Sequence, residues 1–209
     1  MVFLSTICIF CDILFNMPNL IPRTFAIAIS GEIPKYLTKD EVHRVLDVIP
    51  KGKVRDHLII NLLWHSGVRV SELISIKYQN IDFYLHTLNI ETLKQKRGKE
   101  KRVYRSIPLQ GDILNELGDY TFKDEDRLFP ITRKEVWYLV RRYCRKAGID
   151  PKRSHPHVFR HSFAVNAILQ GVAPGTLAGW LGHSSLASTM VYSKVLAKDT
   201  RQIMEGLEF

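Results

Sequence analysis

The sequence predicts a domain of the α+β class that is mostly helical and carries one small antiparallel β-sheet or hairpin. Most apolar residues recur at the spacing of a helix face, and two short segments rich in β-branched residues flank a charged stretch. Glycine or proline separates the segments. The chain of 209 residues is long enough for one well-buried core with a small appendage. Its composition, 45% hydrophobic and 24% charged, is that of an ordinary globular protein.

Residues 1–33 are predicted to form an apolar arm and a linker, ahead of a folded body at 34–209. The first fifteen residues are strongly apolar, but Asp12 interrupts them and no basic residue precedes them, as a secretory signal would require. This apolar run is also shorter than the roughly 20 residues that span a bilayer. Pro18 and Pro22 make the following stretch a poor helix.

The three cysteines, Cys8, Cys11 and Cys144, favour a reducing compartment, because an odd number does not suggest a disulfide framework. Cys8 and Cys11 have C-x-x-C spacing, but a tetrahedral zinc site needs a second pair of ligands, and no suitably spaced pair lies nearby. We therefore expect a cytoplasmic protein with no metal bound at this motif.

The helical segments are predicted in chain order. Thr38 to Glu41 is a capping box that opens the first helix. Residues 54–65 are apolar on most sides, as expected for a helix buried in the core. A longer helix over 134–147 ends at Gly148. Shorter helices are expected near Ser71 and over 110–118, 158–170, 174–181 and 185–196.

The hairpin is predicted from residues 87–93 and 102–108. Both segments are rich in β-branched residues and partly alternate between apolar and polar. The stretch KQKRGKEK between them carries a glycine and several positive charges. We therefore expect two antiparallel strands joined by a basic tip.

The chain carries an excess of positive charge. Lysine and arginine number 30 against 21 aspartates and glutamates, a net charge of +9. Such an excess favours polyanionic partners through phosphate contacts and counterion release, although many basic proteins bind no nucleic acid. On the 134–147 helix, Arg141, Arg142 and Arg145 lie away from the apolar side. We expect them to contact DNA, or else to form a solvated helix face.

The segment HPHVFRHSFA at 155–164 is the most unusual stretch of the chain. It places His157, Arg160 and His161 within one turn of a predicted helix start. Imidazole and guanidinium groups gathered there suit an anionic ligand, because a helix N-terminus already favours negative charge.

Two further polar clusters could carry chemistry. SGVRVSEL, at 66–73, places Arg69 just after a glycine turn, with Glu72 three residues later. LGHSSLASTMVYSKV, at 181–195, places His183 at a turn and Tyr192 on a predicted helix. Each cluster alone is more often structural than catalytic, and Arg69 and Glu72 could simply form a local ion pair.

Taken in order over residues 34 to about 196, these segments resemble the tyrosine recombinase family, also called the phage integrase family. SGVRVSEL resembles its first arginine box, HVFRH its H-x-x-R box, LGHSS its L-G-H box and TMVYSKV its nucleophile box, while IPKYLTKDEV resembles the opening helix of its catalytic domain. The resemblance implies that fold and assigns catalytic roles to Arg69, Lys96, His157, Arg160, His183 and Tyr192. Lys94 and Lys99 leave the choice of hairpin lysine open.

The resemblance implies a site-specific recombinase or integrase that cleaves and rejoins double-stranded DNA. Tyr192 would attack the phosphodiester and form a covalent 3′-phosphotyrosyl link, which conserves the bond energy so that no ATP is needed. No metal or other cofactor is expected, because arginines and histidines supply the positive charge. The implied partners are DNA and further copies of the chain, as a dimer or tetramer on DNA, with no membrane.

Each remaining residue of the family set has a chemical role. Arg69 and Arg160 would clamp the phosphate, since planar guanidinium groups match its geometry. His157 would act as general base or orient the tyrosine, and His183 would donate a hydrogen bond to the phosphate. Lys96 would protonate the leaving 5′ oxygen. Among the neighbours, His155 and His161 are interpreted as structural, and Glu72 as a support for Arg69 or His157.

One feature departs from the family pattern. Family members usually carry a separate N-terminal DNA clamp of about 80 to 100 residues, whereas only about 34 residues precede the catalytic part of this sequence. We therefore expect weak DNA binding and leave autonomous recombination open. Two alternatives remain at this point: DNA relaxation of the type IB topoisomerase kind, and a DNA-binding accessory protein with a decayed active site.

Overall fold

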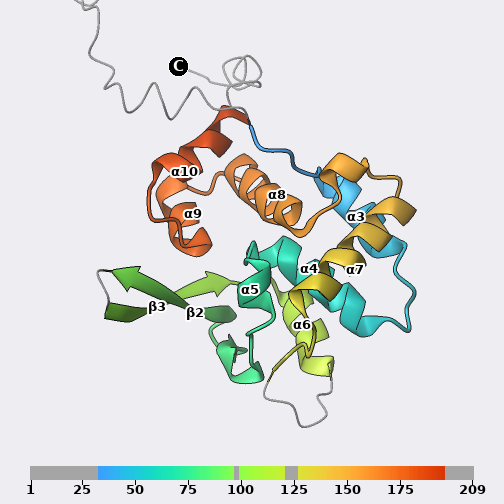
Figure 1. Cartoon of the computed structure of the whole chain (residues 1–209), viewed down its shortest axis with the longest axis horizontal. Coiled ribbons are helices and arrows are strands. Elements are labelled where there is room, and N and C mark those ends of the chain that lie inside the picture. Colours follow the sequence, from blue (N-terminus) through green and yellow to red (C-terminus); the bar gives the residue numbers. More distant parts are fainter. Residues whose placement is uncertain (1–32, 97–98, 121–126, 196–209) are drawn as a thin grey trace, which may run out of the picture.

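A computed structural model describes residues 33–96, 99–120 and 127–195 (Figure 1). The predicted arm lies outside the described residues, apart from its last position. The helices are α3 (Lys39–Asp47), α4 (Val54–Ser66), α5 (Val70–Leu73), α6 (Gly111–Asp119), α7 (Arg133–Lys146), α8 (Pro156–Leu169), α9 (Pro174–Leu181) and α10 (Ala187–Met190). Short 3-10 helices are η1 (Tyr78–Asn80), η2 (Pro151–Arg153) and η3 (Val191–Ser193). The strands are β1 (Ile81–Asp82), β2 (Thr87–Lys96) and β3 (Lys99–Pro108). The predicted class is confirmed.

Side-chain caps explain where two of the longer helices begin. Thr38 Oγ1 accepts a hydrogen bond from the Glu41 backbone N–H at 3.2 Å, and the Thr38 N–H donates to Glu41 Oε2 at 3.0 Å. This is the predicted capping box. Thr132 and Glu135 form a second such box, so α7 begins one residue before the predicted start. Both boxes satisfy N–H groups that have no partner within the helix.

Helix α4 runs through the middle of the fold. It packs against α3, α6, α7 and α8 (Figure 1). Consecutive residues from Leu58 to Trp64 are buried, so the helix has no solvent-exposed stripe over this stretch. The expectation of a core helix is confirmed. Within the described residues, no helix is long and apolar enough to cross a bilayer.

The sheet is antiparallel in the order β1-β2-β3 and extends to one side of the helices (Figure 1). Strand β2 pairs with β3 from Thr87 opposite Pro108 to Lys96 opposite Lys99. The predicted hairpin is confirmed, with strands longer than the sequence suggested. The two-residue strand β1 is an addition, too short for its alternation to be recognised.

Helix α8 joins two groups of buried side chains. Val158 and Phe159 near its start belong to the larger core, which also includes residues of α3, α4, α6 and α7. Its second half packs in a smaller core with α9 and the C-terminal turns. Tyr192 is a member of this smaller core. The two cores therefore meet along α8.

The helix predicted over 185–196 is shorter and less regular than expected. It begins at Ala187, and after Met190 it tightens into the 3-10 helix η3. Half of the residues in the sequence LASTMVYS are serine or β-branched, and these residue types have modest helix propensity. Tyr192 therefore lies on a tight turn rather than within a regular α-helix.

Gly67 determines how closely α4 approaches the C-terminal helices. It ends α4 with φ of 59°, a left-handed conformation that favours glycine. A β-carbon at this position would overlap the ring of Phe163 and lie 3.1 Å from Leu181 Cδ2. The chain that leads into Arg69 is thus held directly against α8 and α9.

Gly67→Ala should lower the free energy of unfolding by roughly 2–4 kcal/mol, since it adds overpacking to the left-handed strain. Gly148→Ala is the matched control, because Gly148 has φ of 72° but open space around a β-carbon. The control should cost only about 1 kcal/mol. Urea unfolding followed by circular dichroism measures both; equal costs would contradict the packing argument.

Candidate active site

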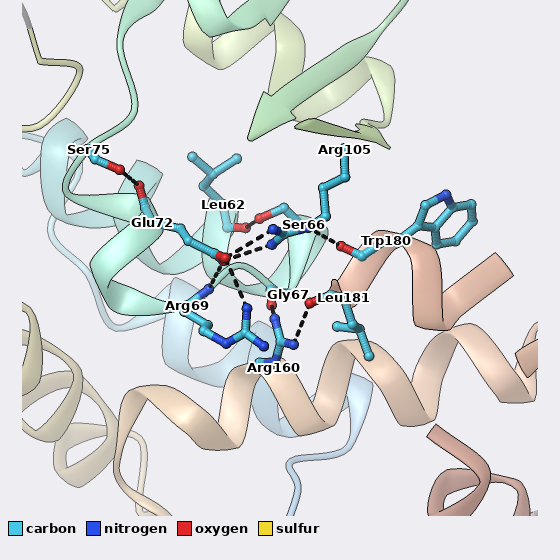
Figure 2. Close-up of polar contacts among 10 residues, drawn as sticks. All are labelled: Leu62, Ser66, Gly67, Arg69, Glu72, Ser75, Arg105, Arg160, Trp180 and Leu181. Atoms are coloured by element: carbon cyan, nitrogen blue, oxygen red, sulfur yellow. Dashed lines mark hydrogen bonds and ion pairs between the residues drawn. The ribbon is translucent and has the colours of Figure 1, made fainter. Parts of the chain in front are cut away.

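The centre of the candidate site is the carboxylate of Glu72 on α5, which is 6% exposed (Figure 2). Oε1 accepts a hydrogen bond from Arg69 Nη1 at 3.0 Å, and Oε2 accepts one from the Arg69 backbone N–H at 2.7 Å. Burial alone would raise the pKa of Glu72, but hydrogen bonds from Arg105 and Arg69 and the charges of both lower it below 4.5. Glu72 is therefore ionised and supports Arg69.

Arg105, on β3, is the second cation that binds Glu72 (Figure 2). Its Nη1 and Nη2 donate to Oε1 and Oε2 at 3.0 and 2.8 Å, a bidentate pairing that fixes geometry better than a single contact. Its Nε donates to the carbonyl oxygen of Trp180 at 2.8 Å. Arg105 therefore joins the hairpin to α5 and to the end of α9.

Arg160, on α8, connects the first arginine segment with the L-G-H segment. Its Nη1 donates to the carbonyl oxygen of Gly67 at 2.7 Å, and its Nη2 donates to that of Leu181 at 2.6 Å (Figure 2). The residue is 5% exposed. Burial, followed by repulsion from Arg69, lowers the pKa of Arg160 to about 10, so it remains charged at neutral pH.

The turn after α9 is shaped by its contact with Arg105. Gly182 ends α9 with φ of 64°. A β-carbon at Gly182 would lie 3.1 Å from Arg105 Nη1 and 3.2 Å from its Cζ. This close approach fixes the direction in which the chain enters His183.

His183 lies on that turn and is half-buried. Its Nδ1 is 2.7 Å from the hydroxyl oxygen of buried Thr189. Burial, followed by the charges of Arg160 and Arg69, lowers the pKa of His183 to about 4. A neutral imidazole carries one N–H, and a Thr189 hydroxyl that donates to Nδ1 places this N–H on Nε2.

Tyr192 lies on η3 and is 3% exposed. Its hydroxyl oxygen is 2.8 Å from Nδ1 of His161 on α8. Burial raises the pKa of the Tyr192 phenol, and the charge of Arg160 opposes that effect. Burial, followed by positive charge on His157 and on Arg160, lowers the pKa of His161 to about 4. The tyrosine and its imidazole partner are thus both neutral at neutral pH.

His157 is exposed on the first turn of α8. Its pKa is lowered by partial burial and then by three arginines: Arg160, Arg133 and Arg69. His157 is therefore an exposed residue within electrostatic reach of the arginine cluster.

Most of the predicted residues are brought together, and two residues not assigned from sequence join them. Hydrogen bonds connect the segments of Arg69, Arg160 and His183. The side chain of Lys96 lies outside the described residues, as do those of Lys94 and Lys99. Arg105 and His161 are the additions.

The sequence held a signal for each addition. Arg105 and buried Ile107 are two residues apart on β3, so their side chains lie on the same face of the strand, and an arginine on this core-facing side requires a partner. His161 follows His157 by one helical turn, which places both on one face of α8. Its interpretation as a structural histidine is incomplete, because it contacts the Tyr192 hydroxyl.

Among the described residues, the site gathers arginines around the Glu72 carboxylate, and this concentration of positive charge suits an anionic ligand. Among the residues that the structure describes, no group of three or more His, Cys, Asp and Glu side chains is arranged to hold a metal ion.

The three arginines predicted to contact DNA lie elsewhere, exposed on α7. Arg141, Arg142 and Arg145 line an open hollow of about 720 Å³ together with Trp137 and Tyr138. The Arg141 guanidinium lies 4.7 Å above the Trp137 ring. Exposed cations and aromatic rings form a surface suited to nucleic acid.

Comparison with known proteins identifies the family. The sequence model of the "Phage integrase family" matches residues 35–199. The chain belongs to the phage integrase family. The resemblance seen in the sequence boxes is thereby confirmed, and the match includes every residue that the boxes singled out.

The chain is similar to proteins named as tyrosine recombinases. The protein named Tyrosine recombinase XerA of Pyrococcus furiosus is 37% identical over 184 residues, which cover 83% of this chain and 62% of that protein. Tyrosine recombinase XerD of Haemophilus ducreyi is 29% identical over 182 residues, covering 78% of this chain and 59% of that protein. The chain thus spans about three fifths of the length of these relatives.

Solved structures share the fold. The crystal structure of XerA recombinase superposes with a TM-score of 0.67 at 26% identity, covering 86% of this chain and 66% of that one. The site-specific recombinase XerH, solved bound to its difH substrate before cleavage, gives a TM-score of 0.65 at 23% identity, with coverage of 81% and 52%. The predicted catalytic-domain fold is confirmed.

Arg105→Ala should lower the free energy of unfolding by roughly 2–4 kcal/mol, because it removes a bidentate guanidinium partner from the buried Glu72 carboxylate. Arg153→Ala is a matched control. Arg153 forms a bidentate pair with Glu41 at 2.8 and 2.7 Å and also binds a backbone carbonyl, but its side chain is 30% exposed.

The control should cost only about 1 kcal/mol, as a solvent-accessible ion pair does. Urea unfolding of both variants provides the comparison. Equal losses would show that the pairing of Arg105 with Glu72 contributes no more to the free energy of unfolding than a surface ion pair does.

Proposed function

We propose that this chain is a site-specific recombinase or integrase that cleaves one strand of double-stranded DNA through Tyr192 and rejoins it to a new partner. The observation that carries the proposal is the position of Arg160, which bonds to the segments bearing Arg69 and His183. Tyr192 packs on the same helix. A phosphodiester bound to the arginines would therefore lie close to the tyrosine.

The proposed reaction is phosphoryl transfer without metal or ATP. Tyr192 Oη attacks phosphorus and forms a 3′-phosphotyrosyl diester, while the 5′ oxygen leaves with a proton. Arg69 and Arg160 stabilise the charge on the non-bridging oxygens. His183 donates Nε2–H to one of these oxygens, and His157, exposed beside the arginines, contacts the phosphate from the solvent side.

The hairpin lysine is proposed as the proton donor to the leaving oxygen. Lys96 is the first candidate, at the end of β2 opposite Lys99. The hairpin that carries it is anchored to the site through Arg105 and Glu72, so a donor on the hairpin would be positioned relative to the phosphate.

Recombination is favoured over relaxation by the names of the similar proteins, which are tyrosine recombinases. Joining a cleaved strand to a new partner requires a second cleaved strand with its own tyrosine. We therefore propose that at least two copies act together, as a dimer or tetramer on DNA. The exposed Arg141, Arg142 and Arg145 are proposed to contact DNA outside the cleavage point.

We further propose that the chain acts in the cytoplasm. Cys144 is a free, buried cysteine, and burial raises the pKa of its thiol to about 11, so it has little thiolate to oxidise. This chemistry suits a reducing compartment that contains DNA.

Tyr192→Phe should abolish the covalent adduct while preserving DNA binding, because it removes only the attacking oxygen and keeps the buried ring. Adduct formation is measured on a pre-nicked suicide duplex by denaturing gel electrophoresis. Tyr143→Phe is the matched control, since Tyr143 is equally buried and its hydroxyl donates to Asp56 at 2.9 Å on another part of the fold. The control should form the adduct. An adduct on the Tyr192→Phe chain would identify another nucleophile and refute the proposal.

Lys96→Ala should slow cleavage of ordinary DNA by roughly a hundredfold, the usual contribution of a general acid. A 5′-bridging phosphorothiolate has a sulfur leaving group that needs no proton, so the variant should recover on this substrate. Lys94→Ala should cleave both substrates like the unaltered chain. Rescue of Lys94→Ala in place of Lys96→Ala would transfer the role to Lys94.

A further inference from the structure

The polar contact of the Tyr192 hydroxyl is with an imidazole outside the family's set of catalytic residues. His161 Nδ1 lies 2.8 Å from the hydroxyl oxygen, with the two rings inclined at 43° and their centroids 6.0 Å apart. At this distance one of the two groups donates a hydrogen bond to the other. The hydroxyl is the group that must lose its proton during attack.

We propose that His161 is a further catalytic residue, the base that accepts the Tyr192 proton during strand cleavage. This inference rests on the function proposed above. As Oη forms its bond to phosphorus, its proton moves to Nδ1 and the ring becomes imidazolium. The bond from phosphorus to the 5′ oxygen breaks, its electron pair stays on that oxygen, and the hairpin lysine supplies the proton. In religation the imidazolium returns its proton to the tyrosine oxygen.

The position of His161 suits a base better than that of His157. His157 is exposed, its charge is influenced by three arginines, and no described contact joins it to the Tyr192 hydroxyl. His161 lies one turn further along α8, partly buried against the smaller core that contains Tyr192. General base catalysis requires hydrogen-bond reach to the proton, and the described contact of His161 provides it.

The surroundings of His161 keep its lone pair available. The groups that influence its charge are His155, His157 and Arg160 on its own helix, His183 on the turn after α9, and Tyr192 on η3. Cationic neighbours disfavour a proton on the ring before DNA binds. A bound phosphate would offset the arginine charge and favour the imidazolium at the moment it forms.

The first test needs no activity. Side-chain ¹⁵N NMR of the unaltered chain, with Tyr192→Phe for comparison, reports which ring nitrogen of His161 carries the proton. We expect an unprotonated Nδ1 that accepts a hydrogen bond and loses it in Tyr192→Phe. A protonated Nδ1 that donates to the hydroxyl would overturn the inference, whether or not the chain cleaves DNA.

The second test is the single-turnover rate of cleavage of a pre-nicked duplex at saturating protein. His161→Asn places an amide atom where Nδ1 lies, so it can hold the hydroxyl but cannot take up its proton. We expect a roughly hundredfold or larger loss of rate with unchanged DNA affinity. His57→Asn is the matched control, because Nδ1 of His57 on α4 lies 3.1 Å from Oε2 of Glu116 on α6, away from the site. The control should cleave normally.

The pH dependence separates a base from a residue that only positions the tyrosine. The rate of the unaltered chain should fall as the pH drops through the pKa of His161 in the DNA complex, because a protonated ring cannot accept. His161→Asn should lack this decrease. A His161→Asn chain with full rate and the same acidic decrease would overturn the inference. An unaltered chain that forms no adduct would instead refute the proposed function, and the NMR result would still decide the tautomer.

Discussion

The guanidinium group of Arg160 holds together three segments that are far apart in the sequence. A charge that is 5% exposed must be hydrogen-bonded, and here both partners are backbone carbonyl groups at helix ends, those of Gly67 and Leu181. Arg69 and His183 each follow one of these residues by two positions. These two bonds use two of the five N–H groups of the Arg160 guanidinium. The other N–H groups of this side chain can donate to an anion.

This arrangement places like charges close together before any ligand binds. Burial and mutual repulsion lower the pKa of Arg160 to about 10 and those of His161 and His183 to about 4. Glu72 offsets part of the repulsion by pairing with Arg69. A bound phosphodiester would offset the remaining repulsion. The side chains are therefore already placed for an anion, and their positive charges are balanced only when an anion binds.

Sequence reasoning predicted the fold class, the hairpin and the order of the functional boxes, because these follow from periodicity, turn residues and short motifs. It could not give pairings that depend on tertiary structure. Arg105 meets Glu72 because the β2–β3 hairpin packs beside α5. His161 has no role among the family's catalytic residues, so the sequence alone indicates a structural histidine. Its contact with Tyr192, 31 residues away on a 3-10 helix, is visible only in the tertiary structure.

The glycines of the first arginine box and the L-G-H box restrict which substitutions relatives of this protein can accept while keeping the fold. Gly67 and Gly182 both adopt left-handed backbone conformations with neighbouring side chains packed directly against them, so their replacement disturbs folding rather than chemistry. Arg105 and Arg160 share this constraint, because they hold buried segments together. The Tyr192 hydroxyl does not, since phenylalanine would keep the buried ring. A lineage that lost catalysis would therefore keep both glycines and these two arginines after the tyrosine had diverged. In genomic comparisons, the glycines and these arginines would mark a preserved scaffold, and the tyrosine would distinguish an active copy from an inactive one.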